Sequence, residues 1–492
     1  MSRKVSMRPN QVHVFSISGS DFAYDSATGS LLKLDRVGRA LVDYCIEQEL
    51  DLLSFSSAEE ERAEMDRAVC LLSPEFSPND IQDAWDEIRS QSGKTIWGRD
   101  DVFGEHGVLK PGSDDTLLHL PTPKAMCLNV AHDCNLVCRY CFASQGRFGG
   151  NPMLMSPETS KKAIDFLVDA SGNRRYLDVD FFGGEPLLCF DTVKQTVLYA
   201  AEKAKKHDKV FRFTITTNCT LLTRDIIDFL NEWRISAILS LDGRPETHNR
   251  MRRYRDGGTS HDDALKNALS LVESRGGSDY YVRGTYTKYN LDFYNDVKYL
   301  YDIGFRKISL EPAIGVDTDW AISESDLPAL EESYLRLTDF WEECYRSKDP
   351  LDFYHFEIGL THGVCKERRI TGCGAGYEYL AVTPTGEIYP CHQLVGQEEF
   401  AMGYIHEPWG GGKVEESGKR EELARRFFLS RVPNKPKCMD CWARYLCGGG
   451  CHAGSLGATG STLDPVPLSC SIMKLRLEFA LYIQYLKVMQ EF

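Results

Sequence analysis

The sequence has no long apolar run and no excess of basic residues. No stretch of its 492 residues approaches the ~20 apolar residues of a membrane-spanning helix, which argues against a membrane protein. The formal net charge of −15 argues against a surface for nucleic acid or anionic membranes, because such surfaces carry a basic patch. The N-terminal residues MSRKVSMRPNQVHVF lack the apolar run of a signal peptide, so we expect a cytoplasmic protein.

Cysteine, in contrast, is abundant. The chain contains 17 cysteines, and disulfides explain them poorly in a reducing compartment. Metal ligation explains them better. Most of the cysteines gather in two places, a short loop around residue 138 and a C-terminal region from 365 to 470.

The length predicts two or three domains. The N-terminal region is expected to form strands and then helices, with Ser77 capping a helix that starts at Pro78. A linker rich in glycine and proline follows, and the chain then alternates between strand and helix. The predicted divisions are a small domain at 1–93, a linker at 94–120, an α/β domain at 121–320, a helical bridge at 321–364, and a cysteine-rich region at 365–492 with a closing helix over 474–490.

Six short apolar runs alternate with amphipathic stretches of helical length. This alternation predicts an α/β fold with parallel strands, as an open sheet or a partial barrel. Ligands of such sheets bind beyond the carboxyl ends of the strands, and the motifs described next follow those ends. The runs are 125–131, 176–182, 210–217, 235–241, 280–287 and 305–311.

The first motif is CNLVCRYC, with Cys134, Cys138 and Cys141 directly after the first strand. Three thiolates on one loop can hold three corners of a [4Fe–4S] cluster, whose fourth iron then stays open to a reacting molecule. The alternative is a zinc or structural site, for which His132 lies nearby.

The second motif is FFGGEP at Phe181–Pro186, at the end of the second strand. Its two glycines allow the backbone to approach a ligand closely, because no side chain intervenes. Taken alone, the motif is equally consistent with a simple turn between strand and helix.

The third motif is a set of eight cysteines in the C-terminal region. Eight thiolates satisfy two further [4Fe–4S] clusters with four ligands each, while paired C-x-x-C-like spacings leave zinc as the alternative. The eight are Cys365, Cys373, Cys391, Cys438, Cys441, Cys447, Cys451 and Cys470.

Together these motifs resemble the radical S-adenosylmethionine (radical SAM) superfamily with a SPASM extension. The resemblance rests on CxxxCxxC, GGEP and TTN at successive strand ends and on the spacing of the tail cysteines. The segments NVAHDCNLVCRYCFA, SLDGRPETHNRMR, CGAGYEYLAVTPTGEIYPCHQ and CMDCWARYLCGGGCHA look most like maturases that form thioethers in cysteine-rich ribosomal peptides, the six-cysteine-peptide (SCIFF) and ranthipeptide group. The resemblance implies a partial (β/α)6 barrel, with an N-terminal peptide-recognition domain of winged-helix type and a C-terminal SPASM domain.

The resemblance also implies site residues. The cluster of Cys134, Cys138 and Cys141 would be catalytic, with Tyr140 beside the adenine of S-adenosylmethionine. The remaining cofactor contacts would be Gly183, Gly184 and Glu185 to the methionine amino group, Asn218 and Ser240 to the ribose, and Arg283 to the carboxylate. For Asn218 and Ser240 the alternative is a turn-forming cap, and for Arg283 a surface ion pair.

In the tail, the resemblance implies two auxiliary [4Fe–4S] clusters. The outer one would be held by Cys438, Cys441, Cys447 and Cys470. The inner one would be held by Cys373, Cys391 and Cys451. Cys365 would be either its fourth ligand or a spare residue, where that iron is open to a substrate thiolate.

The implied substrate is a cysteine-rich precursor peptide whose leader binds the N-terminal domain. A flavodoxin or ferredoxin is the implied electron donor, and neither nucleic acid nor membrane is an expected partner.

Two other interpretations stay open. One is a different SPASM reaction, such as sulfatase-type oxidation of Cys or Ser or a carbon–carbon crosslink. The other is a zinc-ribbon adaptor on an α/β scaffold.

Overall fold

The computed structural model begins with a small antiparallel sheet. β1 (Val12–Ile17) and β2 (Ser20–Asp25) form a hairpin, and β3 (Leu31–Leu34) is the last strand of this sheet. Ser18 and Gly19 both have positive φ, 50° and 73°, as two-residue hairpin turns require. The described residues are 11–50, 52, 55–97, 121–313, 315, 318–360, 370–409 and 414–490.

Three helices follow the N-terminal sheet, and each begins at a capped residue. Ser77 accepts a hydrogen bond from the Asp80 amide at 3.2 Å, and Pro78 occupies the first helical position, as predicted. These helices bury one face of the sheet in a local core that includes Trp85. The helices are α1 (Arg36–Glu47), α2 (Ala58–Leu72) and α3 (Pro78–Gln91).

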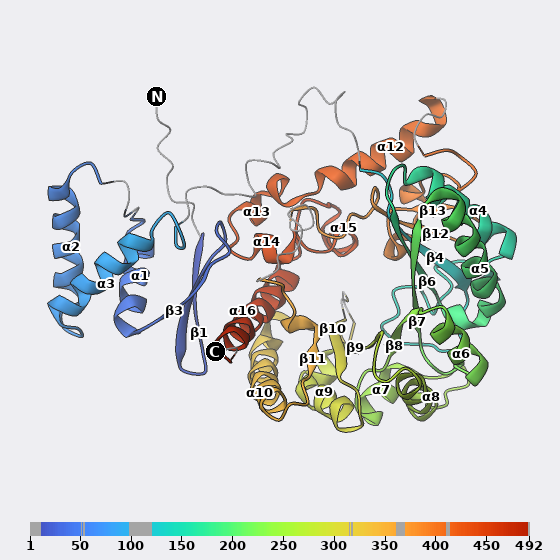
Figure 1. The fold of residues 1–492 in the computed structure, drawn as a ribbon, viewed down its shortest axis with the longest axis horizontal. Coiled ribbons are helices and arrows are strands. Elements are labelled where there is room, and N and C mark those ends of the chain that lie inside the picture. The colour runs from blue at the N-terminus through green and yellow to red at the C-terminus, as the bar shows by residue number, and fades with distance from the viewer. Residues whose placement is uncertain are drawn as a thin grey trace.

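The main sheet contains the six predicted parallel strands, each within two residues of its expected position. They stand side by side in the order β10-β9-β8-β7-β6-β4, and the sheet curls without closing, with the intervening helices on its outer side (Figure 1). The α/β prediction is therefore confirmed. The strands are β4 (Ala125–His132), β6 (Tyr176–Gly183), β7 (Val210–Thr217), β8 (Ser236–Ser240), β9 (Tyr280–Tyr286) and β10 (Lys307–Pro312).

The intervening helices pack their apolar faces against the sheet and complete the core. None of the helices that the structure describes has the length and apolar character needed to cross a lipid bilayer. The helices are α4 (Pro157–Ala170), α5 (Phe190–His207), α6 (Arg224–Glu232), α7 (Pro245–Met251), α8 (His261–Ser274) and α9 (Phe293–Asp302).

Short strands that the sequence did not reveal extend this sheet at both edges. β12 (Tyr379–Val382), from the cysteine-rich region, pairs in parallel with β4, and β13 (Ile388–Tyr389) pairs with β12. At the other edge β11 (Asp352–Phe353) pairs with β10. The two-residue strand β5 (Met153–Leu154) pairs with β4. The cysteine-rich region is thus continuous with the main sheet.

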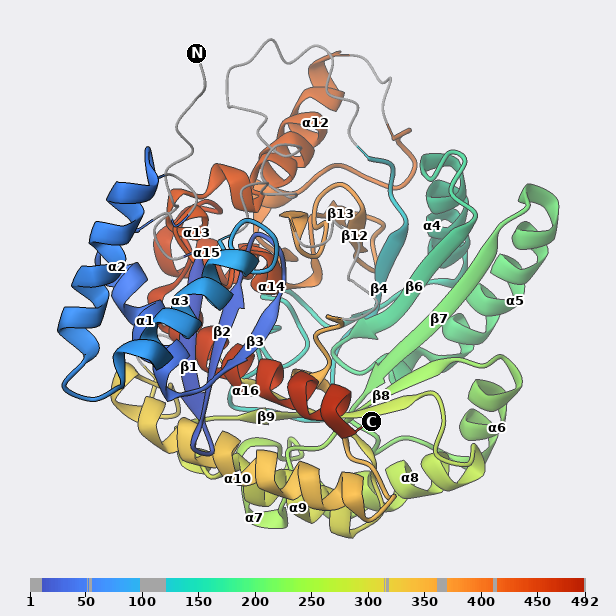
Figure 2. The ribbon, with the colours of Figure 1, turned by 60° about the vertical axis from the view of Figure 1, so that its left-hand side comes forward.

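The last helix, α16 (Pro467–Gln490), contacts both the N-terminal sheet and α10 (Leu327–Arg346). It begins seven residues before the predicted start at 474, so that Cys470 lies in its first turn. Phe22 of β2 packs edge-on against Tyr485 of α16, with ring centroids 5.1 Å apart. The N-terminal sheet therefore lies between its own helices and α16, while the other side of α16 packs on α10 (Figure 2). The remaining C-terminal helices are α12 (Val414–Leu429), α13 (Pro436–Met439), α14 (Arg444–Cys447) and α15 (His452–Thr459).

Candidate active site

Cys134, Cys138 and Cys141 lie together on the loop that follows β4. All three are free, half-buried thiols. Burial, together with the nearby charges of Glu185, Cys138 and Cys141, raises the pKa of Cys134 to about 12. Thiols grouped in this way resist ionisation unless a metal compensates their charge. The donor set therefore fits an iron–sulfur cluster with three cysteine ligands.

The two glycines of GGEP pack directly against the cysteine loop. Gly183 ends β6 with φ +130°, and a Cβ there would lie 2.2 Å from the Ala131 carbonyl oxygen. A Cβ on Gly184 would lie 2.1 Å from the Asp133 carbonyl oxygen. The Glu185 amide donates to that same oxygen at 2.9 Å. The glycines therefore allow the end of β6 to hold the cysteine loop by backbone contacts alone.

Replacing Gly184 by alanine is expected to disrupt this contact. The new Cβ must displace backbone rather than a mobile side chain, which costs about 1–3 kcal/mol in a packed site. We expect the variant to retain less iron at the catalytic loop, measured by iron analysis and by the electron paramagnetic resonance (EPR) signal that responds to S-adenosylmethionine. Gly150→Ala is the control, because its Cβ makes only an ordinary 3.5 Å contact with the Arg147 carbonyl. Equal iron retention in both variants would contradict the prediction.

Glu185 connects the ends of β6 and β7 from a fully buried position. Its carboxylate accepts hydrogen bonds from the Thr217 hydroxyl and the Asn218 amide, both at 2.8 Å, and from the Leu187 amide at 3.1 Å. Burial raises its pKa to about 7, and these donors lower it in part. Glu185 therefore fixes the geometry of two strand ends, and its contact with a cofactor amino group remains a prediction.

Asn218, Ser240 and Arg283 lie at neighbouring strand ends. The side-chain nitrogen of Asn218, Nδ2, donates to the Asn135 side chain at 2.9 Å and lies 3.7 Å from the Cys134 sulfur. Asn218 therefore also holds the cysteine loop. Ser240 of β8 pairs in register with Arg283 of β9. Arg283 is exposed, and among the described residues no carboxylate lies within ion-pair distance of it. The predicted cofactor contacts of these three residues remain predictions.

Tyr140 belongs to a buried network that the sequence did not reveal. Its hydroxyl donates to Asp242 at 2.5 Å, and the Thr285 amide donates to the same carboxylate at 2.9 Å. Arg252 donates through Nε to both Asp242 oxygens at 3.1 Å, and its guanidinium lies 5.4 Å from the centre of the Tyr140 ring. The sequence signal was an acid two residues after the end of β8 with an arginine ten residues later, inside SLDGRPETHNRMR.

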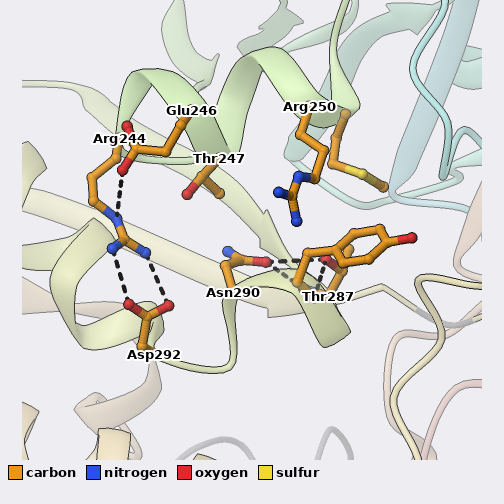
Figure 3. Close-up of a pocket in the computed structure, with 9 residues that line it drawn as sticks. Arg244, Glu246, Thr247, Arg250, Thr287, Asn290 and Asp292 are labelled. Atoms are coloured by element: carbon orange, nitrogen blue, oxygen red, sulfur yellow. Dashed lines mark hydrogen bonds and ion pairs between the residues drawn. The ribbon is translucent and has the colours of Figure 1, made fainter.

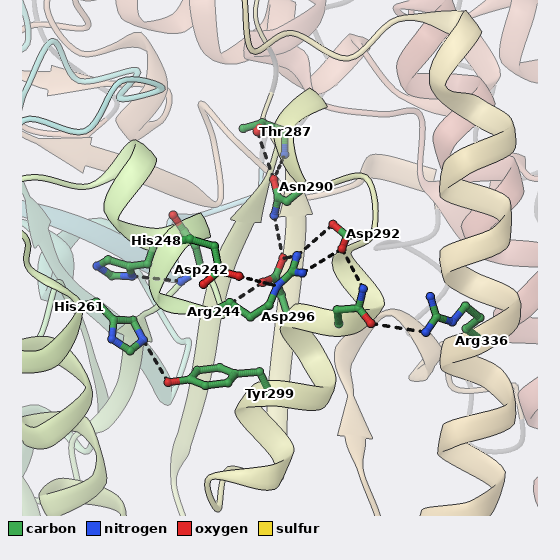
Figure 4. Close-up of polar contacts among 12 residues, drawn as sticks. Asp242, Arg244, His248, His261, Thr287, Asn290, Asp292, Asp296, Tyr299 and Arg336 are labelled. Carbon is green, nitrogen blue, oxygen red and sulfur yellow. Dashed lines mark hydrogen bonds and ion pairs between the residues drawn. The ribbon is translucent and has the colours of Figure 1, made fainter.

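A second polar network connects the residues that follow β8 with those that follow β9. Arg244 bonds both oxygens of Asp292 at 2.9 Å and Asp296 through Nε at 2.8 Å, while Asn290 donates to Asp296 at 3.1 Å (Figure 4). Beside it, Arg244 and Arg250 line a hollow of about 180 Å³ between α7 and the loop after β9 (Figure 3). This network fixes α7 and α9 against each other.

The tail cysteines form two groups of neighbouring thiols. Burial, together with Cys373 and Cys451, raises the pKa of Cys391 to about 12. Burial, together with Cys447, Cys470 and Cys441, likewise raises the pKa of Cys438 to about 12. In the described ranges, no three His, Cys, Asp or Glu side chains are spaced to hold a single metal ion. Cys365 lies outside the described residues, as do 98–120 of the predicted linker.

A buried lysine lies between these two groups. Lys435 is 0% exposed, and its ammonium donates to the Gly449 carbonyl oxygen at 2.7 Å. Its electrostatic partners are cysteines of both groups, Cys438 and Cys447 on one side and Cys451 and Cys373 on the other. A buried charge needs a counter-charge. Metal-bound thiolates supply one, so Lys435 fits a site occupied by iron–sulfur clusters.

Replacing Lys435 by methionine is expected to lower the stability of the cluster-loaded protein and to raise the stability of the metal-free protein. With iron–sulfur clusters present, loss of the counter-charge should cost about 3–5 kcal/mol, as for other broken buried pairs. After chelation, the same variant should melt at a higher temperature than the parent, because no isolated ammonium remains buried. Thermal unfolding with and without iron measures both effects. Lys437→Met is the control, since Lys437 is 67% exposed. A shift of the same sign in both states would contradict the prediction.

Aromatic side chains connect the catalytic loop with the inner cysteine group. Phe142, next to Cys141, is 50% exposed and lies 5.5 Å from the ring of His392, next to Cys391. Phe182 of β6 lies 5.0 Å from the same ring. Tyr379 bonds the His392 Nδ1 at 2.9 Å. The catalytic loop and the inner group therefore face one another across a short aromatic contact.

Part of the chain matches a known protein family, and known proteins resemble most of its length. Residues 128–284 match the radical SAM superfamily, so the chain carries a radical SAM domain. The radical SAM cyclopropyl synthase TigE of Paramaledivibacter caminithermalis is 23% identical over 72% of each chain. The antilisterial bacteriocin subtilosin biosynthesis protein AlbA of Bacillus subtilis is 22% identical over 76% of each chain.

A solved structure shares the fold. The structure of anSMEcpe with bound AdoMet and Cp18Cys peptide superposes with a TM-score of 0.59 at 20% identity. The match covers 75% of this chain and 99% of that one.

Proposed function

We propose that this chain, which carries a radical SAM domain over residues 128–284, is a maturase that forms thioether crosslinks in a ribosomally made precursor peptide. The observation that carries the proposal is the grouping of its cysteines into a set of three on the catalytic loop and sets of three and four in the tail. The names of TigE and AlbA and the peptide bound in the anSMEcpe structure support a peptide substrate.

The inner group supports the thioether reaction in particular. Its described members are Cys373, Cys391 and Cys451, and three thiolates leave one corner of a [4Fe–4S] cluster for a substrate thiolate. Metal coordination lowers the pKa of that thiol. With Cys365 as a fourth ligand, a nearby base would have to deprotonate the substrate instead.

The protein's own residues position the reactants. Cys134, Cys138 and Cys141 would hold a cluster that, when bound with S-adenosylmethionine, would supply the radical needed to remove a hydrogen atom from the acceptor carbon. Gly183 and Gly184 hold the loop at the correct place beside the strand ends. The substrate thiol would lose its proton as the carbon–sulfur bond forms, and the one electron left over would need an acceptor such as an iron–sulfur cluster held by the tail cysteines. Phe142 and His392 lie between the catalytic loop and the inner group, with their ring centroids 5.5 Å apart.

The N-terminal domain would bind the leader of the precursor. β3 ends its sheet, and an exposed edge strand can pair with an extended peptide. An electron carrier such as a flavodoxin or ferredoxin would supply the electrons.

The test is a reaction without oxygen that contains reductant, S-adenosylmethionine and a cysteine-rich precursor peptide. We expect 5′-deoxyadenosine and a peptide lighter by two hydrogen atoms per bond, because one C–H and one S–H bond are lost. A precursor with its cysteines replaced by serine is the control and should keep its mass. Formation of 5′-deoxyadenosine without mass loss of the parent peptide would reject crosslinking.

A further inference from the structure

We propose that Arg252 is a positioning residue that donates hydrogen bonds to the Cys138 sulfur and makes the catalytic cluster easier to reduce. This inference rests on the proposed function, because it concerns the cluster that Cys134, Cys138 and Cys141 would hold. The reaction needs an electron at that cluster, so a group that raises the reduction potential there acts on the first step.

The register of two chain segments places Arg252 opposite Cys138. Leu136 and Tyr254 form an antiparallel bridge. The Val137 amide donates to the Arg253 carbonyl at 2.8 Å, and the Arg139 amide donates to the Met251 carbonyl at 2.9 Å. Cys138 and Arg252 lie between these two hydrogen bonds, and residues that face each other in this way have Cβ atoms about 4.5–5.5 Å apart.

The guanidinium of Arg252 is held by Asp242 and largely shielded from solvent. Its side chain is 11% exposed, and that of Asp242, which holds its Nε, is 0% exposed. Among the described residues, the structure gives the two Nη groups no oxygen partner. Arginine cannot lose its proton in a protein, so its charge and these N–H donors are permanently present beside the sulfur.

The direction of the effect follows from charge. A cluster gains one negative charge on reduction, and a nearby cation or N–H donor stabilises the more negative state. Reduction potentials of iron–sulfur clusters depend on net charge, hydrogen bonds to sulfur and exposure to solvent. Removal of Arg252 should therefore lower the potential. A purely structural role, clamping Tyr140 and Asp242, would lower stability and leave the potential unchanged.

The experiment is an EPR-monitored redox titration of the full chain, loaded with iron–sulfur clusters, that follows the signal responding to S-adenosylmethionine. Arg252→Met should make the reduction equilibrium constant about tenfold smaller, which is 59 mV for one electron. Arg252→Lys keeps the charge and should recover part of this loss. Arg253→Met is the control and should match the parent, because the Arg253 side chain is exposed and, in the part of the chain that the structure describes, donates to the Gly257 carbonyl alone.

Arg252→Met leaves Asp242 without its arginine, which can prevent folding. The double variant Asp242→Asn and Arg252→Met removes that buried charge and should show the same tenfold fall. Equal potentials in the parent and in either loaded methionine variant would overturn the inference and leave the proposed function intact. A parent without any signal that responds to S-adenosylmethionine would overturn the proposed function itself, and the inference with it.

Discussion

Replacing Cys138 by alanine is expected to abolish cleavage of S-adenosylmethionine and leave the auxiliary sites loaded. The catalytic loop would keep two thiolates, too few to hold a four-iron cluster that must also expose one iron. The tail cysteines lie on other segments and form their own coupled groups, so they should retain their iron. We expect a loss of about four irons from about twelve per chain.

Iron analysis and 5′-deoxyadenosine formation measure this outcome together. Cys70→Ala is the matched control, because Cys70 is an exposed free thiol on α2, far along the chain from every cysteine group. It should retain both iron and activity. Full cleavage activity in Cys138→Ala would show that this loop does not hold the catalytic metal.

Replacing Cys391 by alanine is expected to separate the cleavage of S-adenosylmethionine from the crosslinking of the peptide. The catalytic loop does not depend on Cys391 for its ligands, so 5′-deoxyadenosine should still form. The inner group would keep Cys373 and Cys451 alone, and the substrate thiol would lose both its binding place and the route for the last electron. We expect crosslinked peptide to fall to background, while cleavage of the cofactor continues.

The measurement is the ratio of crosslinked peptide to 5′-deoxyadenosine in one reaction mixture. Cys344→Ala is the control, since Cys344 is a buried thiol on α10 outside the three groups. An unchanged ratio in Cys391→Ala would show that the inner group takes no part in crosslinking. The proposed thioether reaction would then have no binding site for the substrate thiol.

The sequence predicted the central fold because its strands are long and their apolar runs are interrupted by helices. Six parallel strands of five to eight residues appeared at the expected positions. β11, β12 and β13 were missed, since strands of two to four residues carry too little periodicity to detect. The early start of α16 at Pro467 had a visible signal, proline at the first helical position.

The site was predictable where ligands are close together in the sequence. Cys134, Cys138 and Cys141 share one loop, and GGEP follows the next strand. The roles of Asp242 and Arg252 depend on which segments become neighbours after folding, and the side chains of these two residues meet Tyr140 only there. The buried charge of Lys435 was equally hidden, because its partners are cysteines from several separate segments.

The most direct test of the account is the EPR spectrum of the reduced protein, purified and reconstituted without oxygen, before and after addition of S-adenosylmethionine. We expect several iron–sulfur signals, one of which changes when the cofactor binds the open iron beside Cys134, Cys138 and Cys141. A protein that stays free of iron, or whose iron–sulfur signals are all unaffected by the cofactor, would show that this loop holds no cofactor-binding cluster.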